Sequence, residues 1–369
     1  MKVLLLADIG SSHTEKWANG LASKGIIVGL FSLNKSNNQW FDGVENIELI
    51  FHPNRVLKGN KFSEKLGYLR FLPILKRKIK QFQPTILHAH YASSYGLLGA
   101  ITGFQPFVVS VWGSDVYDFP KKKWINRSIL KYTLSTAQRI CSTSYCMKEE
   151  ALKYTNKQII VIPFGIDVKL FNRPEATSVL DEKKKIVIGN IKSLEDKYGI
   201  DTLILAFKLF DEKFPQVDKE LLIVGDGTKR KDYETLVSEL NLVEKVVFTG
   251  KVNHSDVPNY HRMIDVFVCL SKLNSESFGV SLVEAMSSRS IVVASKVDGF
   301  SEVLDHSNKY GYLVEKNNPE QVAEVLGMII LNKKPAIHKT MMSREHILRK
   351  YDWNENLNTM ITVYNEIKP

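Results

Sequence analysis

Short apolar runs alternate with longer amphipathic stretches along this chain, and the alternation starts again near residue 184. Apolar runs of strand length separated by helical patterns are typical of βαβ units, in which the strands are parallel. The predicted strands cover residues 3–7, 26–33, 85–90, 107–112, 139–144, 158–163, 184–191, 220–227, 245–252, 266–271 and 290–297. The predicted helices cover residues 14–25, 65–82, 125–137, 200–213, 229–240 and 280–288. The sequence therefore predicts an α/β fold with two Rossmann-like domains in tandem.

The domain boundaries follow from the length and from one polar stretch. A chain of 369 residues can form two domains with separate cores. Residues 168–183 are polar and contain Pro174, and we interpret them as the connection between the domains. We predict an N-terminal domain over residues 1–167, a second domain over residues 168–349 and a C-terminal helix over residues 350–369 that returns to the first. Because ligands of parallel sheets bind beyond the carboxyl ends of the strands, we expect the site in a cleft between the domains.

Composition excludes several classes of protein. Apolar residues make up 44% of the chain and charged residues 24%, which is an ordinary globular profile rather than a disordered one. No apolar run reaches the ~18–20 residues that a membrane-spanning helix needs. The three cysteines have no metal-ligand spacing and suggest no disulfide framework, and the start MKVLLLADIG does not have the pattern of a signal peptide. We therefore expect a cytoplasmic protein in a reducing compartment.

The net charge of +10 is concentrated in the first half. Residues 1–170 contain 23 basic and 11 acidic side chains, whereas residues 171–369 contain 27 basic and 29 acidic ones. Nucleic acid, an anionic membrane or a phosphorylated small molecule would each suit such a balance, and a solvated face without a partner is the alternative. No recognition motif or aromatic ladder accompanies the basic runs, so we expect no nucleic-acid partner.

The string SESFGVSLVEAM, residues 275–286, is the sharpest chemical signal. It follows a predicted strand, and Gly279 opens a predicted helix whose unpaired N–H groups could hold a diphosphate. Glu276 precedes this anion site and Glu284 lies about one turn into the helix. Carboxylates accept hydrogen bonds from vicinal hydroxyls such as those of a ribose. The alternative interpretation is that both glutamates have no ligand and are merely stabilised by the helix dipole.

A second string, GNIKSLEDKYGID, covers residues 189–201. It follows the first predicted strand of the second half and carries Lys192 and Lys197. Two cations at the carboxyl end of a strand can neutralise a diphosphate leaving group. A loop that merely carries lysines is the alternative.

These two strings and the tandem α/β halves resemble the family 4 glycosyltransferases, which have the GT-B architecture. The strings PFGID, VGDGTKR and VDGFSEVL also lie where that family has similar ones. The resemblance covers essentially the whole chain, and it implies sugar transfer from a nucleotide-sugar with retention of the anomeric configuration. Because lysines and a helix terminus supply positive charge, we expect no metal in this transfer, and the chain contains no Asp-x-Asp string.

The resemblance also implies a role for particular residues of the second half. Glu284 is similar to the glutamate that holds the ribose hydroxyls, and Glu276 to the one that contacts the donor sugar. The backbone groups that would assist Glu276 belong to Ser277, Phe278, Gly279 and Val280. Lys197 resembles the lysine that grips the diphosphate, and Val252 lies in the loop that frames the nucleobase. This chain has Asn190 where the family has an arginine, so we expect Lys192 to supply that charge.

In the first half the resemblance points to the end of the predicted strand 85–90. His90 matches the family histidine that reaches the donor sugar, and we expect His88 and His90 to point to opposite faces of the strand. Many relatives have a histidine where this chain has Trp112, which places more weight on His90. Asp115 would hold either the acceptor or its own loop. Gly10 stands in the loop where relatives use glycines to let the donor phosphate approach.

The sequence thus predicts a retaining, metal-independent hexosyltransferase that needs no cofactor. We expect a UDP-sugar donor, with a GDP-sugar as the alternative, and a saccharide or polyprenyl-diphosphate-linked acceptor in bacterial-type surface glycan assembly. The basic stretch 62–82, with Lys65 and Lys76–Lys80, and the run Lys121–Lys123 before Trp124 resemble an interfacial membrane contact. We therefore expect peripheral association with the inner face of the membrane. A nucleotide-sugar epimerase and a non-catalytic nucleotide-sugar-binding subunit are the competing functions.

Overall fold

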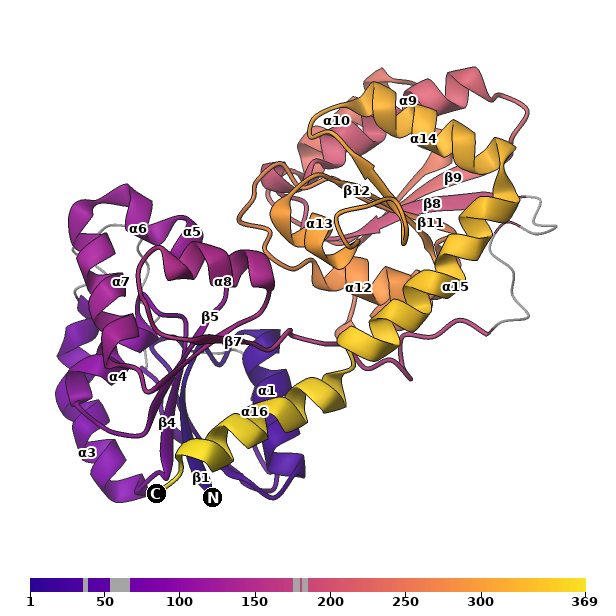
Figure 1. The fold of residues 1–369 in the computed structure, drawn as a ribbon. Coiled ribbons are helices and arrows are strands. Elements are labelled where there is room, and N and C mark those ends of the chain that lie inside the picture. The colour runs from indigo at the N-terminus through magenta and orange to yellow at the C-terminus, as the bar shows by residue number, and fades with distance from the viewer. Residues whose placement is uncertain (36–38, 54–66, 175–179, 181–184) are drawn as a thin grey trace. The chain divides into compact units, whose positions relative to one another are not determined.

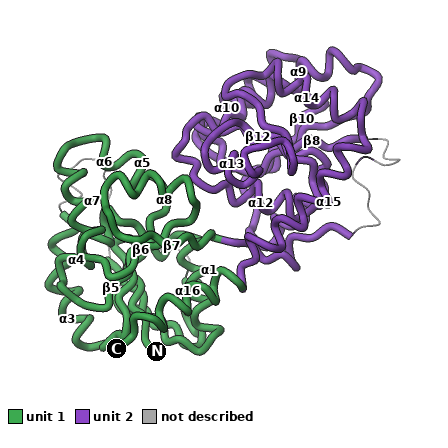
Figure 2. The backbone as a smooth tube through the Cα atoms, viewed as in Figure 1, with its two compact units in different colours: residues 1–164, 355–369 green, residues 165–354 purple. Residues whose placement is uncertain are grey.

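The computed structural model describes residues 1–35, 39–53, 67–174, 180 and 185–369 (Figure 1). The chain divides into two compact units, which Figure 2 shows in two colours. Unit 1 contains Met1–Phe164 together with Glu355–Pro369, and unit 2 contains Gly165–Asn354. Lys65, part of the predicted basic surface, lies outside the described residues.

Unit 1 is built on one parallel sheet of seven strands in the order β3-β2-β1-β4-β5-β6-β7. The strands are β1 (Lys2–Leu6), β2 (Ile27–Phe31), β3 (Ile47–Phe51), β4 (Ile86–His90), β5 (Phe107–Val111), β6 (Arg139–Ser142) and β7 (Ile159–Val161). The helices are α1 (Ser12–Ser23), α3 (Leu72–Phe82), α4 (Tyr95–Thr102), α5 (Ser114–Tyr117), α6 (Phe119–Lys122), α7 (Trp124–Thr136), α8 (Tyr145–Leu152) and α16 (Trp353–Ile367). Every residue of β4 and β5 is buried, because helices cover both faces of the sheet.

Unit 2 repeats this architecture with six parallel strands in the order β10-β9-β8-β11-β12-β13. The strands are β8 (Ile186–Ile191), β9 (Lys219–Val224), β10 (Val246–Gly250), β11 (Val266–Cys269), β12 (Ile291–Ser295) and β13 (Tyr312–Val314). The helices are α9 (Ile200–Lys213), α10 (Arg230–Glu239), α11 (Val257–Met263), α12 (Val280–Ser287), α13 (Asp298–Val303), α14 (Pro319–Leu331) and α15 (Lys333–Lys350). The strand order reverses between β8 and β11, which is the switch point where parallel sheets bind ligands.

From Glu355 onward the C-terminal helix α16 belongs to unit 1. The hydroxyl of Tyr364 on this helix lies 2.6 Å from Nδ1 of His88 on β4, and Tyr364 is fully buried. A buried hydrogen bond between residues so distant in the chain anchors the helix to the sheet.

The predicted parallel sheets are confirmed, but the prediction lacks two strands. These are β3 and β13, and each lies at an edge of its sheet. Residues 168–174, the start of the predicted connection, belong to unit 2, and Val168, Phe171 and Arg173 are buried there. Residues 175–179 and 181–184 of that stretch lie outside the described residues.

Candidate functional site

Gly279 joins the loop after β11 to the first residue of α12. Its φ of +78° is in the left-handed region, which side chains other than glycine disfavour. A Cβ atom at this position would also lie 2.5 Å from Cε1 of Phe300. Glycine is therefore required here both by the backbone conformation and by packing. The first turn of α12 consequently presents its N–H groups beside the backbone of this glycine.

The loop before Gly279 is held by the start of α13. A Cβ atom on Gly299 would lie 2.4 Å from the carbonyl carbon of Ser277 and 2.5 Å from the oxygen of Glu276, so two backbones touch directly. Ser277 and Phe278 are buried, whereas Val280 is half-buried. The structure thus gives the predicted residues after Glu276 a fixed backbone.

Lys192 and Glu276 form an ion pair between the two sequence strings. The distance from Nζ of Lys192 to Oε2 of Glu276 is 2.9 Å, and about a fifth or less of each side chain is exposed, 20% and 16% respectively. Burial acts to raise the pKa of Glu276, but Lys192 and then Lys197 bring the pKa below its ordinary value. Burial likewise acts to lower the pKa of Lys192, and the charge of Glu276 raises it above its ordinary value. Both groups are therefore charged at neutral pH.

Tyr198 lies between the two lysines of the second string. The ammonium of Lys192 is 4.6 Å from the centroid of the Tyr198 ring, and that of Lys197 is 4.8 Å from it. Cations are attracted to the face of an aromatic ring. The ring therefore gathers two positive charges beside Glu276, an arrangement that the sequence analysis missed.

Asn190 stands where the family resemblance leads us to expect an arginine. Its side chain is buried, and Nδ2 donates to the carbonyl of Val268 at 2.5 Å. It thus links β8 to β11 and carries no charge. The prediction that Lys192, two residues later, supplies the missing positive charge stays a prediction, and in this structure Lys192 pairs with Glu276.

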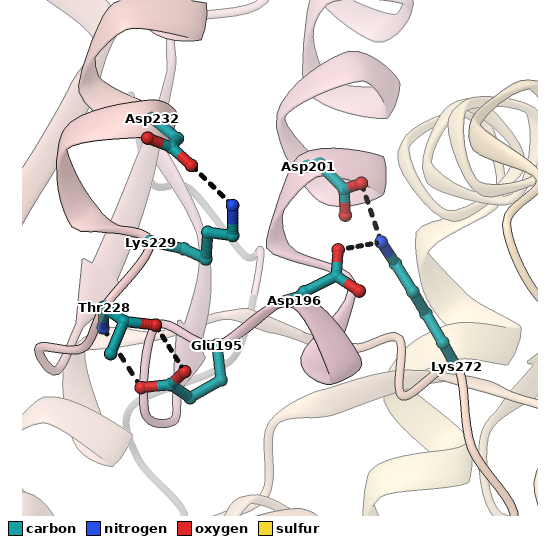
Figure 3. Close-up of polar contacts among 7 residues, drawn as sticks. All are labelled: Glu195, Asp196, Asp201, Thr228, Lys229, Asp232 and Lys272. Carbon is teal, nitrogen blue, oxygen red and sulfur yellow. Dashed lines mark hydrogen bonds and ion pairs between the residues drawn. The ribbon is translucent and has the colours of Figure 1, made fainter.

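Figure 3 shows how the loop 193–199 is held from two sides. Glu195 accepts hydrogen bonds from the backbone N–H of Thr228 at 3.0 Å and from its hydroxyl at 2.6 Å, which hold the pKa of Glu195 below its ordinary value. On the other side Nζ of Lys272 lies 3.0 Å from Asp196 and 2.8 Å from Asp201. The backbone N–H of Lys272 also donates to the carbonyl of Lys197 at 2.8 Å. Lys272 therefore ties the lysine loop to the loop that carries Glu276.

The glycines of the string VGDG are packing residues in this structure. A Cβ atom on Gly225 would lie 2.1 Å from the carbonyl oxygen of Lys192, and one on Gly227 would lie 2.4 Å from that of Leu194. No side chain fits between these two backbones. The glycines thus hold the loop after β9 against the lysine loop.

Glu284 lies on α12 and is largely buried. Its Oε2 is 3.2 Å from Nε2 of His261 on α11, a residue that the sequence analysis did not single out. A histidine in a short helix gives no local signal, because its role depends on a partner 23 residues away. Val252, the remaining predicted residue of unit 2, follows β10 and is half-buried.

In unit 1 the expectation about His88 and His90 is wrong, since their rings lie on the same face with centroids 4.7 Å apart. Residues two apart in a strand always share a face, because side chains alternate with a period of two. His88 bonds Tyr364 and the hydroxyl of Ser110, the latter at 2.8 Å. Burial lowers the pKa of His88 to about 3.

His90, the predicted contact to the donor sugar, is the last residue of β4 and is 2% exposed. Its Nδ1 has no hydrogen-bond partner among the residues that the structure describes. Its ring packs against Trp112 with centroids 4.4 Å apart. Burial, with smaller contributions from His88 and His13, holds the pKa of His90 well below its ordinary value. His90 is therefore a neutral imidazole at neutral pH.

Gly10 lies in the loop after β1 and Asp115 in the short helix α5 after β5, at the same end of the sheet of unit 1. Asp115 is fully buried and accepts hydrogen bonds from the backbone N–H groups of Ala92, Trp112 and Gly113 at 2.8–3.1 Å. Burial raises its pKa despite these bonds. Asp115 thus holds its own loop, one of the two roles that the sequence allows. Gly10 is exposed, and its N–H donates to Oδ1 of Asp8 at 2.9 Å.

The described basic side chains of unit 1 include an exposed set on α3 and α6. Lys76, Arg77 and Lys80 on α3 are exposed. Lys121 pairs with Glu150 at 3.0 Å, and the neighbouring Trp124 is 80% exposed. Within the described ranges, no helix is both long enough and apolar enough to cross a membrane. Nor do the same residues include a group of three or more His, Cys, Asp and Glu placed to hold a metal ion.

Two family models match the chain, one for each unit. The model described as "Glycosyl transferase 4-like" matches residues 2–144, and that described as "Glycosyl transferases group 1" matches residues 172–345. The chain is 26% identical to the N-acetyl-alpha-D-glucosaminyl L-malate synthase of Bacillus anthracis over 297 residues, 76% of this chain and 74% of that protein. It is also 26% identical to the phosphatidyl-myo-inositol mannosyltransferase of Mycobacterium tuberculosis over 316 residues, 83% of this chain and 81% of that protein.

Solved structures share the fold at low identity. Sucrose-phosphate synthase from Thermosynechococcus elongatus has a TM-score of 0.83 at 19% identity, covering 99% of this chain and 98% of its own. HepE from Anabaena, solved in complex with UDP, has a TM-score of 0.80 at 19% identity, and the match covers both chains completely, 100% each. At such identities the likeness supports the two-domain fold.

Proposed function

Because this chain belongs to the family 4-like glycosyltransferases of GT-B type, we propose that it transfers a hexose from a nucleotide-sugar with retention of the anomeric configuration. The observation that carries this proposal is the charged cluster of Lys192, Lys197 and Glu276 at the switch point of unit 2. The lysines and the first turn of α12 suit a diphosphate. When an anionic ligand pairs with Lys192 in place of Glu276, the carboxylate of Glu276 can accept hydrogen bonds from sugar hydroxyls.

We propose a same-face substitution as the reaction. The bond between the anomeric carbon and the diphosphate oxygen breaks, and a bond from the acceptor oxygen to that carbon forms on the same face. The acceptor proton passes to the departing diphosphate, whose growing charge the lysines stabilise. His90, as a neutral imidazole, would offer a ring nitrogen to a hydroxyl of the donor sugar. No cofactor or metal takes part in this scheme.

The donor is proposed to be a UDP-sugar, with a GDP-sugar as the alternative. HepE of Anabaena, which shares the fold, was solved with UDP and with UDP-glucose. The proposed acceptor is a saccharide or a polyprenyl-diphosphate-linked saccharide of bacterial-type surface glycan assembly. The name of the mycobacterial relative indicates a lipid acceptor, phosphatidyl-myo-inositol.

We also propose that the basic face of unit 1 contacts an anionic membrane from the cytoplasmic side. Exposed cations on α3 and the exposed Trp124 combine charge with an aromatic anchor. Co-sedimentation with vesicles that contain phosphatidylglycerol tests this surface. We expect binding at moderate salt by the native chain and loss of it in a variant with glutamine at Lys76, Arg77, Lys78 and Lys80. Equal sedimentation of both proteins would contradict the membrane contact.

The transfer itself is tested by incubating the protein with single UDP- and GDP-sugars, with and without saccharide acceptors, and by assigning the product anomer by NMR. We expect an acceptor-dependent product that keeps the donor configuration, and its loss in E276Q. The matched control E239Q alters an exposed glutamate at the end of α10. A free epimerised sugar without acceptor would identify an epimerase, and nucleotide binding without turnover would identify a binding subunit.

A further inference from the structure

His261 is a buried titratable residue to which the proposed reaction gives no role. It lies on α11 and is 0% exposed. Its ring is packed between aromatic neighbours, with centroid distances of 5.6 Å to Phe171 and 5.4 Å to Phe267. Its Nε2 lies 3.2 Å from Oε2 of Glu284, while Nδ1 has no partner among the described residues.

The contact between His261 and Glu284 determines which atom of the pair donates the hydrogen bond. Because a carboxylate only accepts hydrogen bonds, this contact requires a proton on Nε2, which donates to Glu284. Nδ1 makes no hydrogen bond among the described residues, and an unsatisfied buried polar atom lowers the stability of the fold. For Oε1, the other oxygen of Glu284, the described residues provide no hydrogen-bond donor.

The backbone of His261 is anchored as firmly as its ring. Nη2 of the buried Arg173 donates to the carbonyl of His261 at 3.2 Å and to that of Ile264 at 2.6 Å. Arg173 also pairs with the fully buried Asp265 at 3.4 Å. Ring packing and the hydrogen bond to its main chain therefore both fix the position of His261, whose Nε2 contacts Glu284.

We propose that His261 is a positioning residue that holds one oxygen of Glu284 and turns the other toward the vicinal hydroxyls of a nucleotide ribose. This inference rests on the proposed function and on the family resemblance, which implies that Glu284 holds the ribose hydroxyls. A glutamate with three rotatable bonds binds a diol better when its rotamer is fixed beforehand. His261 thus acts on ribose recognition without touching the nucleotide.

Two amide substitutions separate this role from general packing. In H261Q the amide nitrogen takes the place of Nε2 and can still reach Glu284, whereas in H261N it takes the place of Nδ1 and cannot. Both bury the same polar group, so each controls for the other. Calorimetric titration with UDP and with 2′,3′-dideoxy-UDP, and with the corresponding guanosine nucleotides, measures the preference for the ribose hydroxyls.

We expect the native protein and H261Q to prefer the ribose form, and H261N to bind it on the order of tenfold more weakly with unchanged affinity for the dideoxy form. In an E284Q background we expect H261N to have no further effect. An equal loss for both nucleotides, or an unaltered preference in H261N, would overturn the positioning role. If the native protein binds none of these nucleotides, the proposed function fails as well.

Discussion

Units 1 and 2 both place polar side chains at the carboxyl ends of a parallel sheet, but they differ in charge. In unit 2, Lys192 and Glu276 form an ion pair beside Lys197 and Tyr198. In unit 1, burial keeps His90 neutral, and Asp115 already accepts three backbone hydrogen bonds. In a charged pair, the cation can exchange its carboxylate partner for an anionic ligand. A neutral side chain, or one whose hydrogen bonds are already made, can only orient a ligand. This difference supports the proposal that the diphosphate binds to unit 2.

The largest expected effect is a difference in kcat between removing a charged side chain of unit 2 and replacing a neutral one of unit 1. We expect K197A to lower kcat by about 10²–10³-fold, because the proposed role of Lys197 is to stabilise the charge of the leaving group. H90Q keeps a polar group of similar reach, and we expect a loss of only about tenfold. Steady-state kinetics with the active donor measure both, and K213A, at an exposed lysine of α9, is the control. A greater loss in H90Q than in K197A would reverse the assignment.

The next effect concerns the fixed backbone at Gly279. G279A introduces both a strained φ and a contact with Phe300, so we expect a loss of about 1–3 kcal/mol in unfolding free energy and a lower donor affinity. Gly25 has a φ of +76°, and no atom lies within 4 Å of the position that an alanine methyl would take there, so G25A isolates the backbone strain. Denaturant titration compares the two variants. Equal losses would show that packing against Phe300 contributes nothing.

A pH-dependent effect tests the neutral character of unit 1. The pKa of His88 is about 3 in the fold against an ordinary value of 6.5, so the unfolded chain binds its proton first as the pH falls. Stability is therefore complete above pH 6.5 and is lost below it, by about 1.4 kcal/mol per pH unit for this one group. We expect H88N to be less stable at pH 7 but to lose less stability between pH 6.5 and 4.5. Urea unfolding measures the unfolding free energy across this pH range. The same dependence on pH in the native protein and in H88N would contradict a neutral His88.

The smallest effect concerns Lys272, which connects the two loops of unit 2. Burial acts to lower its pKa, but Asp201 and Asp196 raise it, so it is charged at neutral pH. Removing the ammonium in K272M leaves the backbone bond to Lys197 in place. We expect kcat to fall about fivefold with little change in stability, and K272R to restore part of it. The control K296M alters an exposed lysine paired with Glu315, and an equal loss there would show that surface charge alone matters.

The sequence predicts the fold well where strands are buried on both faces. Strands β4 and β5 are continuous apolar runs for that reason, whereas β3 mixes Glu48 into an edge strand and β13 has three residues. The candidate site could be inferred from the sequence where a motif carries its own chemistry, as around Glu276. Contacts such as that of His261 with Glu284 join separate helices and leave no local pattern. The string VGDG carries no chemistry of its own that could be recognised from the sequence, and its glycines pack against the backbone of Lys192 and Leu194.

Hydrogen exchange with and without UDP tests most directly the assignment of nucleotide binding to unit 2. Peptides from residues 189–199 and 270–284 report on the charged cluster and on α12, and peptides from residues 86–92 and 107–116 report on the corresponding loops of unit 1. We predict that UDP slows exchange in the first pair, and that K197A abolishes this protection. Protection confined to the unit 1 peptides, or none in either unit for UDP and GDP, would contradict the account.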